Sequence, residues 1–169
     1  MSEKWVEIEE ILGGLIGDLT MAVTVLKDYE AKPFLHEPQH KVKRQCLWRL
    51  CVHSIVINCR KYVELNQKYG KEFQELIPEH NHIRGVFNNA INKNSAIKKL
   101  RNHCVAHVND KSKYLKPTEA QAEIVKMFDG ESADAFLDWI CPDNINSTDQ
   151  TDSLVGVIEL LRDAVSAKL

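Results

Sequence analysis

The sequence lacks the features of a fibrous, membrane-spanning or secreted chain. Seven glycines and five prolines among 169 residues are too few for a fibrous or disordered protein. The most apolar early stretch, residues 11–26, carries Asp18 and is too short and too polar to span a bilayer. The opening residues, MSEKWVEIEE, are acidic and hold no apolar signal segment. We therefore expect a cytoplasmic protein with no membrane association.

Cysteine is present but lacks the pattern of a disulfide framework. No two cysteines form a C-x-x-C pair, and their number, five, is odd. Four of the five fall in apolar helical patterns, which is typical of reduced, buried thiols in a cytosolic protein. The five are Cys46, Cys51, Cys59, Cys104 and Cys141.

The sequence also has no large excess of charge of one sign. The net charge of −2 does not suggest a general nucleic-acid coat protein, although a local basic patch stays open. A chain of this length buries roughly 70% of its unfolded surface without further cross-links. We expect one domain spanning residues 1–169.

Strand-like alternation is absent, and helical periodicity takes its place. Apolar residues spaced by three and four predict a first helix over about residues 2–29. Three glycines in it, Gly13, Gly14 and Gly17, either admit a close neighbouring helix or are merely tolerated. The seam comprises Trp5, Ile8, Leu12, Leu15, Leu19, Ala22 and Leu26.

A connector at residues 31–39, with Pro33 and Pro38, precedes a second helix over about 40–69. Its middle, residues 46–59, is apolar almost all round, which predicts burial on most sides and makes His53 a hydrogen-bonded core histidine. Further helices are expected over about 79–92, 95–108 with Asn94 as cap, 118–128 and 132–140. Thr151 or Asp152 would cap a last helix. These elements predict an all-α, up-and-down bundle with additional short C-terminal helices.

The last helix should place one apolar face in the core. Its members are Leu154, Val157, Ile158, Leu161 and Val165.

The stretch LRNHCVAHVND, residues 100–110, combines an arginine with two histidines. On a helix, His107 lies about 20° from Leu100 and borders an apolar strip, so it is either a core histidine or a site residue. Arg101 lies about 120° round from His107 and about 9 Å along the axis. Two copies related by a two-fold axis would bring both residue types to one groove, which predicts a homodimer.

The same stretch lies in a basic segment. Residues 93–116 contain seven Lys or Arg and one acid, Asp110, a local balance of +6. Such a patch can bind phosphates by charge. A solvated basic face is the alternative; it is common for lysines alone and less convincing where Arg, Asn and two His share the same turns. The candidates for phosphate or RNA binding are Lys98, Lys99, His103, Lys111 and Lys113.

The residues Arg101, Asn102 and His107 resemble the R-N-x-x-x-x-H form of the R-x(4–6)-H motif of the HEPN superfamily. The run KKLRNHCVAHVND is similar to the abortive-infection AbiU-like branch, with Asp110 one position later than the commonest spacing there. The resemblance implies a helical bundle that dimerises through the motif helix. Many such proteins are metal-independent endoribonucleases acting as toxins or phage-defence effectors, and others only bind nucleotides or partners.

The chemistry suits the implied catalytic residues Arg101, Asn102 and His107. A histidine moves protons near neutral pH, and an arginine binds phosphate and stabilises developing charge. We expect no cofactor and no metal: His103 and His107 are spaced to share one, but no third ligand is evident. Cys104 has no activating geometry for a nucleophile.

Two hypotheses follow. The first is a dimeric HEPN-type ribonuclease that cuts single-stranded RNA, leaves DNA intact and has an antitoxin or other protein partner. The second is a non-catalytic helical module that binds nucleotide, RNA or a protein partner.

Overall fold

The structure, a computed structural model, describes residues 3–102, 115–143 and 149–169. Within these ranges it contains seven α-helices and no strand, which confirms the all-α prediction. The helices are α1 (Glu3–Glu30), α2 (Lys41–Leu76), α3 (Asn81–Lys93), α4 (Ser95–Leu100), α5 (Pro117–Met127), α6 (Ala133–Ile140) and α7 (Leu154–Ser166). Four short 3₁₀ turns, η1 (Pro33–His36), η2 (Pro38–His40), η3 (Pro78–His80) and η5 (Gln150–Asp152), connect them.

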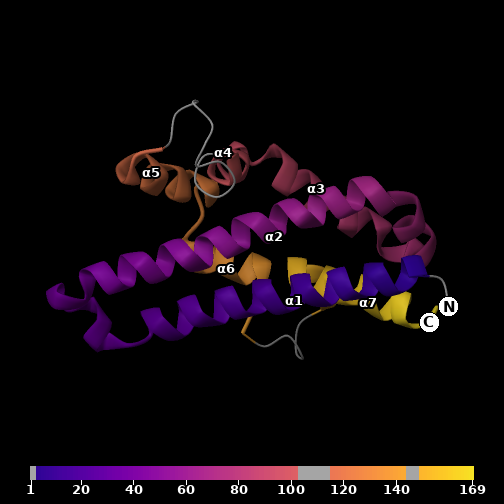
Figure 1. The fold of residues 1–169 in the computed structure, drawn as a ribbon, viewed down its shortest axis with the longest axis horizontal. Helices are drawn as coiled ribbons and strands as arrows, with labels where there is room; N and C mark the ends of the chain where they lie inside the picture. Colours follow the sequence, from indigo (N-terminus) through magenta and orange to yellow (C-terminus); the bar gives the residue numbers. More distant parts are fainter. Residues whose placement is uncertain (1–2, 103–114, 144–148) are drawn as a thin grey trace.

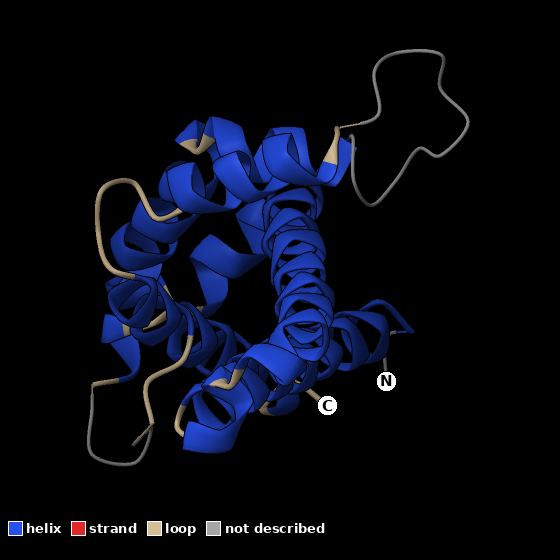
Figure 2. Cartoon of the chain, turned by 90° about the vertical axis from the view of Figure 1, so that its left-hand side faces the viewer, coloured by secondary structure: helices blue, strands red, loops and turns tan. Residues whose placement is uncertain are grey.

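The long helices α1 and α2 form an antiparallel pair joined by η1 and η2 (Figure 1). Helix α7 packs along α1, while α3 and α4 pack on α2, and α5 packs on α4. Both chain ends lie at the same end of the molecule (Figure 1). The end-on view shows helices and loops, and no strand, among the described residues (Figure 2). No helix among the described residues is long and apolar enough to cross a membrane.

Helix α1 has the predicted seam. Its buried residues include Ile8, Leu12, Leu15 and Leu19, and Trp5 packs at the edge of the core. No described atom lies within 4 Å of a Cβ built on Gly13, Gly14 or Gly17, so these glycines do not mark a close helix contact within the chain.

Helix α2 continues past its predicted end at Tyr69. The backbone there leaves the helical region (φ −123°, ψ 22°), and the helix then resumes to Leu76. Residues 51–59 include no exposed side chain, as predicted, but the preceding turn is more open, and Leu50 is 65% exposed. The prediction of burial on most sides was therefore wrong for residues 46–50, where Arg49 and Leu50 are exposed and the other three residues are half-buried.

The last helix has the predicted buried face but a different cap. Ser153, not Thr151 or Asp152, is the N-cap, and its hydroxyl accepts from the Gly156 amide at 3.1 Å. Thr151 and Asp152 belong to η5, where Asp149 accepts from the Thr151 amide. All five predicted core residues of α7 are 0% exposed: Leu154, Val157, Ile158, Leu161 and Val165.

Candidate functional site

The site predicted from the sequence begins on α4, which Asn94 caps by accepting from the Ile97 amide at 3.1 Å. The Asn94 amide group also donates to the Met127 carbonyl at 2.8 Å, so one residue starts α4 and ties it to α5. Ile97 and Leu100 are buried, as the expected apolar strip requires. This packing fixes the end of α4 against α2.

Arg101 and Asn102 directly follow α4 and have a π-helical backbone. The Arg101 guanidinium donates to the Asn102 side-chain oxygen at 3.3 Å and to Oε1 of Glu64 on α2 at 3.4 Å. Both members of the Arg101–Glu64 ion pair are open to solvent, with side chains 39% and 51% exposed. A long, exposed pair of this kind holds an arginine only weakly.

Lys98 and Lys99 are both exposed on α4. Lys99 is engaged: its Nζ lies 2.7 Å from Oε1 of Glu123, and Lys126 approaches the same oxygen at 2.9 Å. Hydrogen bonds from Lys99 and then Lys126 hold the pKa of Glu123 below its usual range. The Glu123 carboxylate thus offsets part of the positive charge that Lys99 was expected to offer to phosphates.

The remaining predicted site residues lie outside the described residues. They are His103, His107, Lys111 and Lys113. Their proximity to Arg101 and Asn102 therefore stays a prediction. Among the residues that are described, no three His, Cys, Asp or Glu side chains are grouped to hold a metal ion.

Helix α2 carries a second basic stretch that the sequence reasoning missed. Residues 38–63 contain no acid and six basic residues: Lys41, Lys43, Arg44, Arg49, Arg60 and Lys61. A search for long acid-free runs would have found it, because its local charge equals that of residues 93–116.

Three arginines of this stretch contact neutral groups. Arg44 donates to Nδ1 of His36 at 2.8 Å, and Arg60 donates to the side-chain oxygen of Asn92 at 3.2 Å. Arg49 approaches the Cys46 sulfur at 4.0 Å. Within the described ranges, none of these three arginines has a carboxylate within 4.0 Å. Their charge is therefore available to an anion.

A groove of about 970 Å³ lies between the first half of α2 and helix α5. Leu100, the last residue of α4, lines it, and Arg101 is the next residue in the chain. Arg44, Trp48, Arg49 and His53 line the α2 wall.

His53 was expected in the core, but it is only half-buried and faces this groove. Partial burial and then the positive charge of Arg49 lower its pKa.

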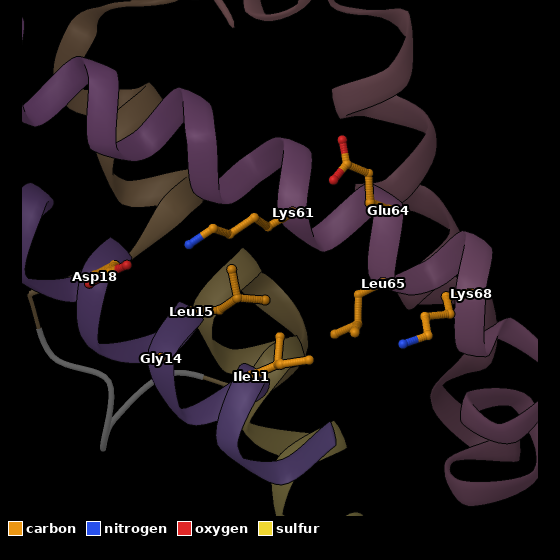
Figure 3. A pocket seen from close by; sticks show the side chains of 8 residues that line it. All are labelled: Ile11, Gly14, Leu15, Asp18, Lys61, Glu64, Leu65 and Lys68. Atoms are coloured by element: carbon orange, nitrogen blue, oxygen red, sulfur yellow. The ribbon is translucent and has the colours of Figure 1, made fainter. Parts of the chain in front are cut away.

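A second, smaller hollow of about 410 Å³ lies between α1 and α2. Lys61 reaches across it toward Asp18, while the Glu64 carboxylate points away from Ile11 and Leu15 (Figure 3). That direction brings Glu64 to Arg101. The hollow is lined by Ile11, Gly14, Leu15, Asp18, Lys61, Glu64, Leu65 and Lys68.

Comparison with known proteins gives one informative likeness. No protein-family model matches the chain, and no curated protein does either. A solved structure that is similar is the integron cassette protein Vpc_cass2 from the mobile metagenome of V. paracholerae. It is 81% identical, the match covers 98% of each chain, and the TM-score is 0.90. The chain belongs to the same family as this integron cassette protein.

Proposed function

We propose that the protein is a metal-independent endoribonuclease of HEPN type, toxin-like or phage-defence-like, that acts on single-stranded RNA in the cytoplasm. The observation that supports this best is the state of Arg101. Its guanidinium is partly exposed, lies beside Asn102 and, among the described residues, contacts α2 through the 3.4 Å ion pair with the exposed Glu64. A phosphate can displace such a partner at little cost.

The proposed chemistry uses the nucleophile that RNA carries. His107 takes the proton of a ribose 2′-hydroxyl, whose oxygen then attacks the adjacent phosphorus. The bond from phosphorus to the 5′-oxygen breaks, and that oxygen takes up a proton. Arg101 binds the phosphate with two N–H groups and stabilises its growing negative charge, while Asn102 orients the arginine. The products are a 2′,3′-cyclic phosphate and a 5′-hydroxyl.

The proposal includes a two-fold dimer with residues 95–108 at or near the interface. On one straight helix, Arg101 and His107 would point about 120° apart, so two copies supply one groove better than one copy does. Light scattering at tens of micromolar tests this, and a monodisperse monomer would refute it. An antitoxin or other protein partner would bind the same assembly.

A second candidate is a non-catalytic module that binds RNA or nucleotide, or a protein partner. The groove between α2 and α5 favours it, because about 970 Å³ is at the upper end of the volumes that small-molecule sites usually have.

The test is incubation of purified protein with end-labelled single-stranded RNA in excess EDTA. Cleavage should proceed, and DNA of the same sequence should resist because it lacks the 2′-hydroxyl. His107→Ala and Arg101→Ala should each lose about 10²–10⁴-fold in rate. Arg162→Ala is a matched control, since Arg162 pairs with Asp163 on α7 and lies outside the site.

The outcomes separate the two candidates. RNA binding that depends on Arg101, without cleavage of any RNA, favours the non-catalytic module. Cleavage that survives both His107→Ala and Arg101→Ala comes from a contaminant and refutes the ribonuclease.

A further inference from the structure

The groove between α2 and α5 has two walls that a third helix keeps apart. Helix α5 packs on α4, and α4 packs on α2, so α4 acts as a spacer. Leu100 and Leu115 contribute to the apolar surface between the walls, and Ile124 and Phe128 lie on the α5 side. The α2 wall runs from Val42 to His53, about 16 Å along the helix axis.

The α2 wall carries positive charge that the fold leaves available. Arg44 and Arg49 line the groove and contact neutral groups, a histidine nitrogen and a cysteine sulfur. The pKa of His53 is lowered, first by burial and then by Arg49, as an electropositive and partly desolvated wall requires. This wall therefore favours an anion over a cation.

Two acids also line the groove, and one of them is already engaged. Glu30 accepts a hydrogen bond from the Trp48 indole and lies 3.6 Å from His36. The second acid, Asp134, belongs to the first turn of α6. The hydrogen bond to Glu30 fixes the Trp48 indole in the α2 wall, beside Arg44 and Arg49.

The same stripe of α2 leads on toward Arg101. Arg49, His53 and Arg60 fall within about 40° of one another on the helix. Glu64, the partner of Arg101, lies one turn beyond Arg60. The groove itself reaches His53 on α2, and a strand that extended beyond it along this stripe would run toward the residue that the proposed cleavage uses.

We propose that the groove between α2 and α5 binds a short stretch of single-stranded RNA, with Arg44 and Arg49 contacting phosphates and Trp48 and His53 contacting bases. The charge of the groove favours RNA as its ligand over an apolar helix of a protein partner. One wall presents two arginines that have no carboxylate partner among the described residues. Arginine with aromatic groups is the combination that single-strand binding sites use. The inference extends the proposed function, but RNA binding here does not require cleavage.

The test is fluorescence anisotropy with a labelled single-stranded RNA carrying 2′-O-methyl groups throughout, which blocks the proposed cleavage. Arg49→Gln should weaken binding by about tenfold or more and lower the slope of log affinity against log salt by about 0.7. Lys43→Gln is the matched control: it removes the same charge from the same helix, but Lys43 is exposed and does not line the groove. Its effect should be much smaller.

The opposite wall supplies a second, independent pair of variants. Gln121 is exposed on α5 and lines the groove, whereas the neighbouring Ala122 is exposed and does not. Gln121→Glu should weaken RNA binding, and Ala122→Glu, with the same added charge, should have little effect. Circular dichroism of each variant checks that the helices are intact.

The proposal that the groove binds RNA and the proposal that the protein cleaves RNA can be refuted separately. If the wild type does not bind the methylated RNA, or if Arg49→Gln and Gln121→Glu both bind it normally, the groove proposal is overturned, even where unmodified RNA is cut in an Arg101-dependent way. If binding depends on both walls but unmodified RNA is never cut, the groove stands and the ribonuclease fails.

Discussion

Gly156 offers a sharp test of how α7 begins. A Cβ added there would lie 2.3 Å from the backbone oxygen of Gln150, and 2.8 and 2.9 Å from its Cα and carbonyl carbon. The obstacle is backbone of η5, which cannot rotate away as a side chain can. Gly156→Ala must therefore displace η5 or the first turn of α7.

The magnitude follows from two opposing terms. Alanine gains about 1 kcal/mol over glycine inside a helix. Overpacking costs about 1–3 kcal/mol. Because the added Cβ would lie 2.3 Å from a backbone oxygen, the cost for Gly156→Ala should be at or above the upper end of that range. The net loss is about 2 kcal/mol, which lowers the melting temperature by about 4–8 °C in a protein of this size.

The control is the same substitution where space is open. No described atom lies within 4 Å of a Cβ on Gly17, in the middle of α1. Gly17→Ala should therefore raise the melting temperature by about 2–4 °C. Both variants are measured by thermal unfolding followed by circular dichroism. A Gly156→Ala protein as stable as the wild type would refute the contact with η5.

Three further predictions concern capping and titration. Ser153→Ala should lower the free energy of unfolding, measured with urea, by about 1 kcal/mol, because it removes the cap of α7. Asp152→Ala should lower it less, since Asp152 is exposed in η5, and equal losses would contradict the cap assignment. Burial raises the pKa of the Cys59 thiol to about 12. Mass spectrometry after iodoacetamide treatment at pH 8 should therefore find the half-buried Cys46 labelled before Cys59, and early labelling of Cys59 would contradict its burial. The pKa of Glu123 is lower in the folded than in the unfolded state, so the stabilisation it gives is present above its unfolded-state pKa and is lost as the pH falls through its folded-state pKa. Glu123→Gln should therefore lower stability at pH 7 and reduce the loss of stability on acidification. An unchanged dependence of stability on acid pH would refute this.

The helices with a strong apolar period were predictable. The seam of α1 and the face of α7 follow from spacing alone, because burying a continuous stripe outweighs local preferences such as that of Gly13. The end of α2 was harder: Tyr69 does leave helical geometry, but Phe73 and Ile77 are buried, and their packing continues the helix.

The sequence predicted Asn94 correctly as the cap of α4, but neither the cap of α7 nor the contacts between helices were predictable. Thr151, Asp152 and Ser153 are all good capping residues, and only the turn of η5 determines which one reaches the Gly156 amide. The contact of Arg101 with Glu64 joins residues far apart in sequence and depends on how α4 packs on α2. The acid-free stretch of α2 was visible in the sequence, but its place beside the end of α4 was not.

Lys27 on α1 and two arginines on α2 have different kinds of partner. On α1, the Nζ of Lys27 lies 2.5 Å from Oδ1 of Asp138 on α6 and 2.8 Å from Oδ1 of Asp143. These ion pairs help to hold α1 against α6. On the α2 side, Arg49 and Arg60 contact a sulfur and an amide oxygen. An arginine that the fold requires is normally satisfied by a carboxylate or by several oxygens. Arg49 and Arg60 therefore contribute little to packing through their charge, which leaves that charge available to the RNA strand proposed above.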